Sequence, residues 1–178
     1  MHCGETDAAP EEVLEMIRFR PDRLGHALFI PEEGLKLLED DPIPIECCPT
    51  SNVMTLELAS ASTPNNSGSH RDAVVEGLKL HPTLKHWLAI GYPISISTDD
   101  SGVFNTSPTQ ELALLCDAFS LNEWALTGTI WTSVDHVFEP SRRVRSRLAR
   151  DVSLCIKRLL RTLERDEKGK NPEDKRIK

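Results

Sequence analysis

Residues 93–100 read Pro-Ile-Ser-Ile-Ser-Thr-Asp-Asp, a short apolar run that ends in two adjacent carboxylates. A β-branched run of this length, bounded by polar residues, is typical of a strand buried under helices. Two like charges at a buried strand end cost desolvation and repulsion unless a cation or hydrogen-bond donors compensate them. Asp99 and Asp100 are therefore candidate functional residues.

Two further runs of the same kind precede this one, at residues 24–29 (Leu-Gly-His-Ala-Leu-Phe) and 43–48 (Ile-Pro-Ile-Glu-Cys-Cys). Amphipathic helical patterns separate or follow the three strands, at 10–20, 31–41 and 140–164. Alternation of short strands with helices favours βα units and a parallel sheet over a bundle or a sandwich. The carboxyl ends of parallel strands meet at one edge, so we expect His2, His26 and Asp99 to share one pocket.

Two more helices are expected from capping boxes, in which a Ser side chain and a Gln or Glu three residues later bond to each other's backbone N–H groups. The first begins at Ser107-Pro108-Thr109-Gln110 and the second at Ser120-Leu121-Asn122-Glu123. Both motifs precede apolar runs, as helix starts do.

The composition is that of a globular chain: 178 residues, 39% of them hydrophobic, with a formal net charge of −7. We expect one domain over residues 1–165, a surface loop over 59–68 and a charged, disordered tail over 166–178. The acidic balance argues against nucleic acid as a partner. No apolar run is long enough to span a membrane, and Met1 to Asp7 lack the features of a signal peptide, so we expect a cytoplasmic protein.

The five cysteines contain no C-x-x-C pair, which argues against a disulfide framework or a thiolate zinc finger. A single histidine usually packs in the interior or lies at the surface without binding a ligand. We assign such packing or surface roles to four of the six histidines: His70, His81, His86 and His136.

Four motifs, in this order, resemble the successive C-terminal motifs of the adenosine deaminase family, a zinc-dependent group within the metallo-dependent amidohydrolase barrels. They are His2-Cys3-Gly4-Glu5, Arg23-Leu24-Gly25-His26-Ala27, Cys48-Pro49-Thr50-Ser51-Asn52 and Ser97-Thr98-Asp99-Asp100. The continuation from Ser101 to Ser107 is similar to the adenosine deaminase-like branch, which deaminates N6-methyl-AMP. The resemblance implies an α/β fold, the C-terminal half of a TIM (β/α)8 barrel with about four βα units and a long C-terminal helix.

The resemblance also implies roles for individual residues. His2 and Asp99 would be zinc ligands, and Glu5 would be the acid that protonates purine N1. His26 would orient or deprotonate the attacking water, and Asp100 would accept a hydrogen bond from the purine ring. Residues 48–52 would shape the strand end without an assigned chemical role. The implied reaction is hydrolytic deamination at C6 of adenosine, AMP or N6-methyl-AMP.

The chain also departs from the family pattern, because it contains no His-x-His pair, the motif by which the family's first strand supplies two zinc ligands. His2 and Asp99 alone are fewer than the three protein ligands of a usual catalytic zinc site. We therefore expect a half-barrel, from a truncated gene model, a shortened isoform or a degraded copy, that is inactive alone. Two alternatives stay open: a non-catalytic fragment that pairs with a partner chain or itself through exposed strand edges, and another amidohydrolase.

Overall fold

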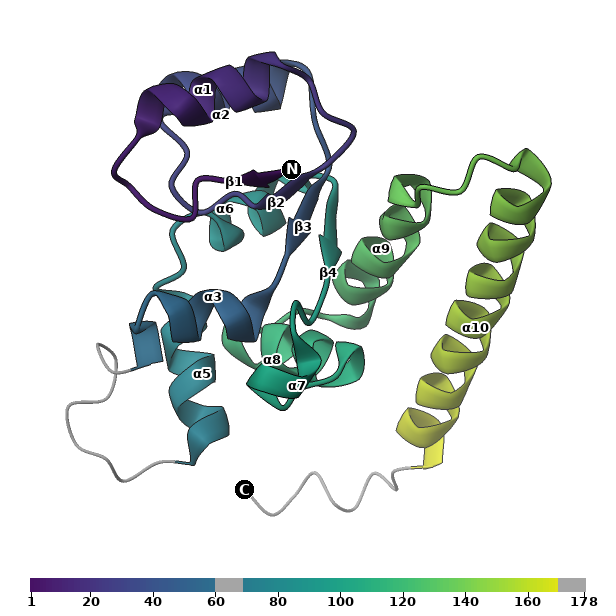
Figure 1. The fold of residues 1–178 in the computed structure, drawn as a ribbon. Helices are drawn as coiled ribbons and strands as arrows, with labels where there is room; N and C mark the ends of the chain where they lie inside the picture. The colour runs from purple at the N-terminus through teal and green to yellow at the C-terminus, as the bar shows by residue number, and fades with distance from the viewer. Residues whose placement is uncertain (60–68, 170–178) are drawn as a thin grey trace. The chain divides into compact units, whose positions relative to one another are not determined.

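The computed structural model describes residues 1–59 and 69–169, and the chain divides into two compact units, Met1–His136 and Val137–Lys178. The first unit contains a sheet of four parallel strands in the order β1-β2-β3-β4, which confirms the predicted α/β fold (Figure 1). Its strands are β1 (His2–Cys3), β2 (Leu24–His26), β3 (Ile45–Cys47) and β4 (Ile94–Ile96).

Helices follow every strand, although those between β3 and β4 were not predicted from the sequence. They are α1 (Pro10–Arg18), α2 (Glu32–Asp40), α3 (Pro49–Thr55), α5 (His70–Lys79), α6 (Leu84–Ile90), α7 (Ser101–Phe104), α8 (Pro108–Phe119), α9 (Glu123–Ser133) and a short 3-10 turn, η1 (Val134–His136). The first residues of the last three strands are fully buried: Leu24, Ile45 and Ile94 are at most 2% exposed. Burial of their apolar side chains between sheet and helices is the main force that holds the unit together.

The strands run in register, so that their carboxyl ends lie side by side. Cys3 is opposite His26 in the first pair of strands, and Cys47 is opposite Ile96 in the last. β2 is shorter than the predicted run 24–29, because His26 and Ala27 adopt left-handed backbone angles (φ of 62° and 50°) that end the strand.

One predicted helix start is wrong. Ser120 does not cap α9; its left-handed φ of 52° ends α8 instead, and the Asn122 side chain accepts the Ala125 N–H at the start of α9. The other predicted start is confirmed, because Ser107 accepts the Gln110 N–H at the start of α8.

The second unit contains α10 (Arg142–Gly169), which matches the predicted long helix and extends beyond it. The division into a domain over 1–165 and a tail over 166–178 stays a prediction: α10 continues through Gly169, and residues 170–178 lie outside the described part of the chain. The predicted loop over 59–68 also lies almost wholly outside it. None of the described helices is both long and apolar enough to cross a bilayer.

Candidate active site

The ends of the strands place the predicted site residues at one edge of the sheet. His26 ends β2, while Glu5 and Asp99 lie in the segments that follow β1 and β4. Gly4 and Asp99 adopt left-handed backbone angles, with φ of 60° and 57°, as His26 does. For a residue with a Cβ this conformation costs roughly 1–2 kcal/mol, and such strain gathers at functional sites.

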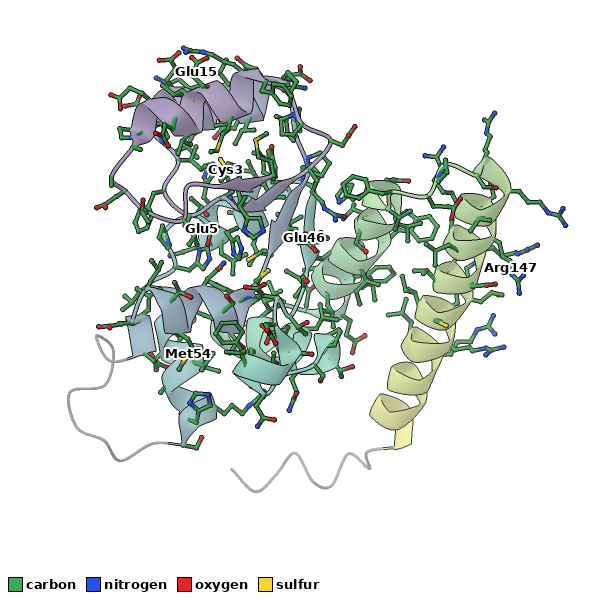
Figure 2. All side chains as sticks on the ribbon, viewed as in Figure 1. Cys3, Glu5, Glu15, Glu46, Met54 and Arg147 are labelled. Atoms are coloured by element: carbon green, nitrogen blue, oxygen red, sulfur yellow. The ribbon has the colours of Figure 1, made fainter. Side chains whose placement is uncertain are left out.

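Glu5 lies between two imidazole rings. Its Oε1 is 2.9 Å from His2 Nδ1, and its Oε2 is 4.0 Å from His26 Nε2. The centroids of the two rings are 5.0 Å apart. The His2 side chain is 73% exposed and that of Glu5 43%, whereas that of His26 is only 6% exposed. The three side chains therefore extend from the surface to the interior, with the carboxylate of Glu5 between the two rings. Figure 2 marks the place of Glu5 in the fold.

Gly4 is the residue that allows Glu5 to occupy this place. The Phe29 N–H donates to the Gly4 carbonyl at 2.8 Å, which holds the segment after β1 against the segment after β2. A Cβ at Gly4 would lie 2.9 Å from the Phe29 carbonyl oxygen, closer than real contacts allow. Close approach and positive φ together require glycine here, directly before Glu5.

Asp99 lies near His26 and Cys48. Ser51 Oγ donates to Asp99 Oδ2 at 2.8 Å, which orients the carboxylate. His26, Cys48 and Asp99 each offer a possible ligand atom within 4.8 Å of the others. Burial, followed by the nearby carboxylates Asp99 and Glu46, raises the pKa of the Cys48 thiol to about 12. Cys48 is therefore a neutral thiol at physiological pH and not a ready-made thiolate ligand.

The structure brings some of the predicted ligands and catalytic residues close together and leaves others apart. His2, Glu5 and His26 form one candidate group, and His26, Cys48 and Asp99 form another. In the described ranges, no such group contains both His2 and Asp99. Asp100 belongs to neither group, because its Oδ1 accepts the backbone N–H groups of Gly102 and Val103 at the start of α7.

Helix α3 carries residues that the sequence analysis placed in a strand end without a role. Thr50 at its start is held by the fully buried carboxylate of Glu111, which accepts from the Thr50 N–H at 2.9 Å and from Thr50 Oγ1 at 2.6 Å. Thr106 Oγ1 donates to the same carboxylate. Glu111 thus fixes the first turn of α3, and with it the positions of Ser51 and Asn52 beside the site.

His81, predicted to have a packing or surface role, belongs to a buried polar chain behind the site. Asn52 bridges it to His26, with 2.8 Å between Asn52 and His26 Nδ1 and 3.1 Å between Asn52 and His81 Nε2. Burial lowers the pKa of His81 from 6.5 to about 4, so that its ring is neutral in the folded protein at pH 7. No pattern in the sequence marks this histidine, because its partner Asn52 lies 29 residues away.

The lowered pKa of His81 makes stability depend on pH. Between pH 6.5 and 4 the unfolded chain takes up a proton at this residue and the folded chain does not, so stability falls as the pH falls. A difference of this size corresponds to a loss of about 3 kcal/mol by pH 4. Urea unfolding at pH 7.5 and pH 4 measures it: His81→Gln should flatten the dependence and the exposed control His86→Gln should not. An equal pH dependence in all three chains would contradict the prediction.

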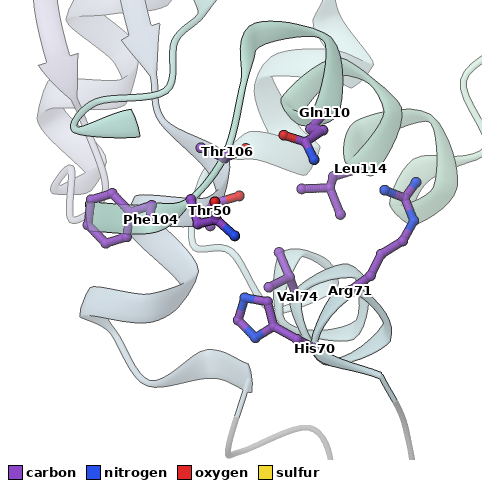
Figure 3. A pocket seen from close by; sticks show the side chains of 9 residues that line it. Thr50, His70, Arg71, Val74, Phe104, Thr106, Gln110 and Leu114 are labelled. Carbon is purple, nitrogen blue, oxygen red and sulfur yellow. The ribbon is translucent and has the colours of Figure 1, made fainter. Parts of the chain in front are cut away.

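A cavity lies beside α3, α5 and α8 (Figure 3). Its lining includes Thr50, Arg71, Thr106 and Gln110, and none of the predicted site residues. Arg71 pairs with Asp117, so its charge is already compensated. Two of its lining residues, Thr50 and Thr106, bond to the Glu111 carboxylate that fixes the first turn of α3.

Comparison with known proteins identifies the family. The model of the adenosine deaminase family matches residues 1–153. The chain belongs to the adenosine deaminase family. Among its curated relatives, an adenosine deaminase-like protein of Drosophila pseudoobscura is 33% identical over 159 residues, and the N6-mAMP deaminase of Arabidopsis thaliana is 31% identical over 138 residues.

These matches cover most of this chain but a smaller share of the relatives. The Drosophila match includes 89% of this chain and 41% of the relative. The Arabidopsis match includes 78% of this chain and 34% of the relative. Among solved structures, one described as the ADAL–IMP complex superposes with a TM-score of 0.72 at 27% identity, over 88% of this chain and 40% of that one. The apo structure of the N6-methyl-AMP deaminase of Arabidopsis superposes with a TM-score of 0.70 at 28% identity, over 85% of this chain and 39% of that one. The chain therefore has the fold of part of a larger deaminase barrel.

Proposed function

We propose that this chain supplies part of the active site of a zinc-dependent deaminase that hydrolyses the C6 amino group of a purine nucleoside or nucleotide. The observation that carries the proposal is the position of Glu5 between His2 and His26, with Asp99 beside His26. Two similar proteins support the substrate class, because one is named as an N6-mAMP deaminase and another was solved with IMP. IMP is the 6-oxo purine nucleotide that deamination of AMP or N6-methyl-AMP leaves.

Each residue then has the role that the family resemblance implies. Glu5, in its protonated form, donates a proton to purine N1 as water adds to C6, and His26 contacts that water. Asp100 accepts a hydrogen bond from the purine ring. Ser51 keeps the Asp99 carboxylate turned toward His26. Ammonia leaves from an unsubstituted substrate and an alkylamine from an N6-alkylated one.

The donors present fit zinc in kind, since imidazole and carboxylate are ligands that zinc prefers. His2 and Asp99 are the residues that would hold it. Zinc, when bound, supplies a water whose pKa is lowered to about 7. Catalytic zinc sites use three protein ligands. Their donor atoms lie about 3.3 Å apart when each zinc–ligand bond is about 2.0 Å. Two ligands do not complete such a site, so we propose that the 178 residues alone do not catalyse the reaction.

Two measurements test the proposal. Elemental analysis of the chain purified without chelator should give well below one zinc per chain, and the chain should not deaminate adenosine, AMP or N6-methyl-AMP. A fusion of residues 1–178 to the preceding part of the Arabidopsis N6-mAMP deaminase should bind zinc and release amine from at least one of these purines. A folded, zinc-loaded fusion that is inactive on all three would refute the deaminase proposal.

A second function is favoured by the outer strands. In the described residues β1 pairs only with β2 and β4 only with β3, so each leaves one edge of backbone hydrogen-bonding groups. Such edges readily pair with another chain. We propose association with a second copy or a partner half-barrel as the non-catalytic alternative. Light scattering after size-exclusion chromatography should then show a mass above 19.9 kDa; a monodisperse monomer would argue against it.

A further inference from the structure

Three buried polar side chains form a line from the site into the interior: His26, Asn52 and His81, each at most 5% exposed. Oδ1 of Asn52 lies 2.8 Å from His26 Nδ1, and Nδ2 lies 3.1 Å from His81 Nε2. A 180° rotation of a side-chain amide about its last carbon–carbon bond exchanges the oxygen and the nitrogen with almost no change of shape. Which atom faces which neighbour is therefore settled by the donors and acceptors around the amide.

His81 determines the direction of these hydrogen bonds. Its Nδ1 accepts the backbone N–H of Leu84 at 3.0 Å and that of Thr83 at 3.3 Å, so it carries no proton. Because burial lowers the pKa of His81 to about 4, the ring is neutral and its single proton lies on Nε2. An amide NH2 facing that nitrogen would set donor against donor. The atom of Asn52 that faces His81 must accept.

We propose that His81 turns the Asn52 amide, so that its oxygen accepts from His81 Nε2–H and its NH2 donates to His26 Nδ1. The proton of the His26 ring is then fixed on Nε2, the nitrogen that faces Glu5 at 4.0 Å.

The position of the Cys47 thiol is consistent with this orientation of the Asn52 amide. Its Sγ lies 3.9 Å from the amide atom of Asn52 that faces His81. Burial raises the pKa of Cys47 well above its usual range, so the thiol keeps its proton and can donate to an oxygen at that place. The amide oxygen then has two donors, and the amide nitrogen has His26 as its acceptor.

The consequence for catalysis rests on the proposed function. Of the two roles that the family resemblance leaves for His26, orienting the attacking water and removing its proton, the arrangement selects the first. An imidazole ring that carries its proton on Nε2 has no lone pair at that nitrogen, so it donates to the water oxygen. Asn52 and His81 touch no reacting atom and are positioning residues, whose task is to hold His26 in one tautomer.

The tautomers can be measured directly in the 178-residue chain. Long-range 1H–15N correlation spectra of uniformly 15N-labelled protein at pH 7.5 separate Nδ1–H from Nε2–H rings, and His26→Gln and His81→Gln assign the two peaks. We expect the Nε2–H pattern for both histidines. A proton on Nδ1 of either, a doubly protonated His26, or an even mixture of tautomers would overturn the proposal. The readout needs neither zinc nor substrate, so a failed deaminase assay leaves it unaffected.

A nearly isosteric substitution gives a second test. Asn52→Asp replaces the NH2 that faces His26 with an oxygen that only accepts, and should move the His26 proton from Nε2 to Nδ1. Asn122→Asp makes the same chemical change at the cap of α9, where the side-chain oxygen accepts the Ala125 N–H, and should leave the tautomer of His26 unchanged. A merely structural role for Asn52 would not move the proton. Unchanged His26 peaks in folded Asn52→Asp would count against the proposal, and the spectrum of the unaltered chain decides the matter if that variant does not fold.

Discussion

Replacing Glu5 with Gln should lower the deaminase rate of the zinc-loaded fusion by a factor of about 10² to 10⁴, the usual contribution of a positioned general acid. Gln keeps the size and polarity of the side chain but cannot transfer a proton to purine N1. Its amide can still bond to His2, 2.9 Å from the carboxylate in the structure, so the local fold should persist. Steady-state amine release at saturating substrate measures the effect, which should fall on kcat more than on KM.

The control for this variant is Glu11→Gln, the same chemical change on an exposed carboxylate in the first turn of α1. It should leave both kinetic constants unchanged. Zinc content and circular dichroism of Glu5→Gln should equal those of the parent fusion. A rate within a factor of three of the parent would remove Glu5 from the role of acid and leave the motif around it without its proposed chemistry.

The order of strands and helices could be predicted from the sequence because it depends on local pattern. The run 93–98 is apolar and β-branched, and a strand forms within it at Ile94–Ile96. The ends of the strands were harder to predict. The left-handed backbone angles of His26 and Ala27 end β2, and they are set by the turn toward the site rather than by hydropathy. The start of α9 was mispredicted for a related reason: Ser120 and Asn122 are both capping residues, and the end of α8 already uses Ser120.

The candidate site was likewise predictable only in part. His2 and His26 lie in strands, and Glu5 and Asp99 lie just after strands, so the rule that parallel strand ends converge predicted one shared edge for them. Asn52 and His81 could not be found by that rule, since one lies inside a helix that was not predicted and the other just before α6. Their role depends on burial and on which nitrogen of a ring faces a donor, and neither is visible in a single sequence.

Removing the buried carboxylate of Glu111 should cost more stability than any other single change discussed above. Glu111→Leu is similar in volume but leaves the Thr50 N–H, the Thr50 hydroxyl and the Thr106 hydroxyl without their acceptor. Each buried donor without a partner costs about 1–3 kcal/mol, and relief of the desolvated charge offsets part of the total, so we expect a loss of about 3 kcal/mol.

Urea unfolding of the 178-residue chain, followed by circular dichroism, measures this loss as a lower midpoint. Glu111→Gln keeps one acceptor oxygen and should fall between the parent and Glu111→Leu, while Glu11→Leu on the exposed face of α1 should change the midpoint little. An unchanged midpoint in Glu111→Leu would mean that water or other groups satisfy Thr50 and Thr106. Since Thr50 directly precedes Ser51 and Asn52, the same variant should also broaden the ring signals of His26, because the first turn of α3 would no longer hold Asn52 in place.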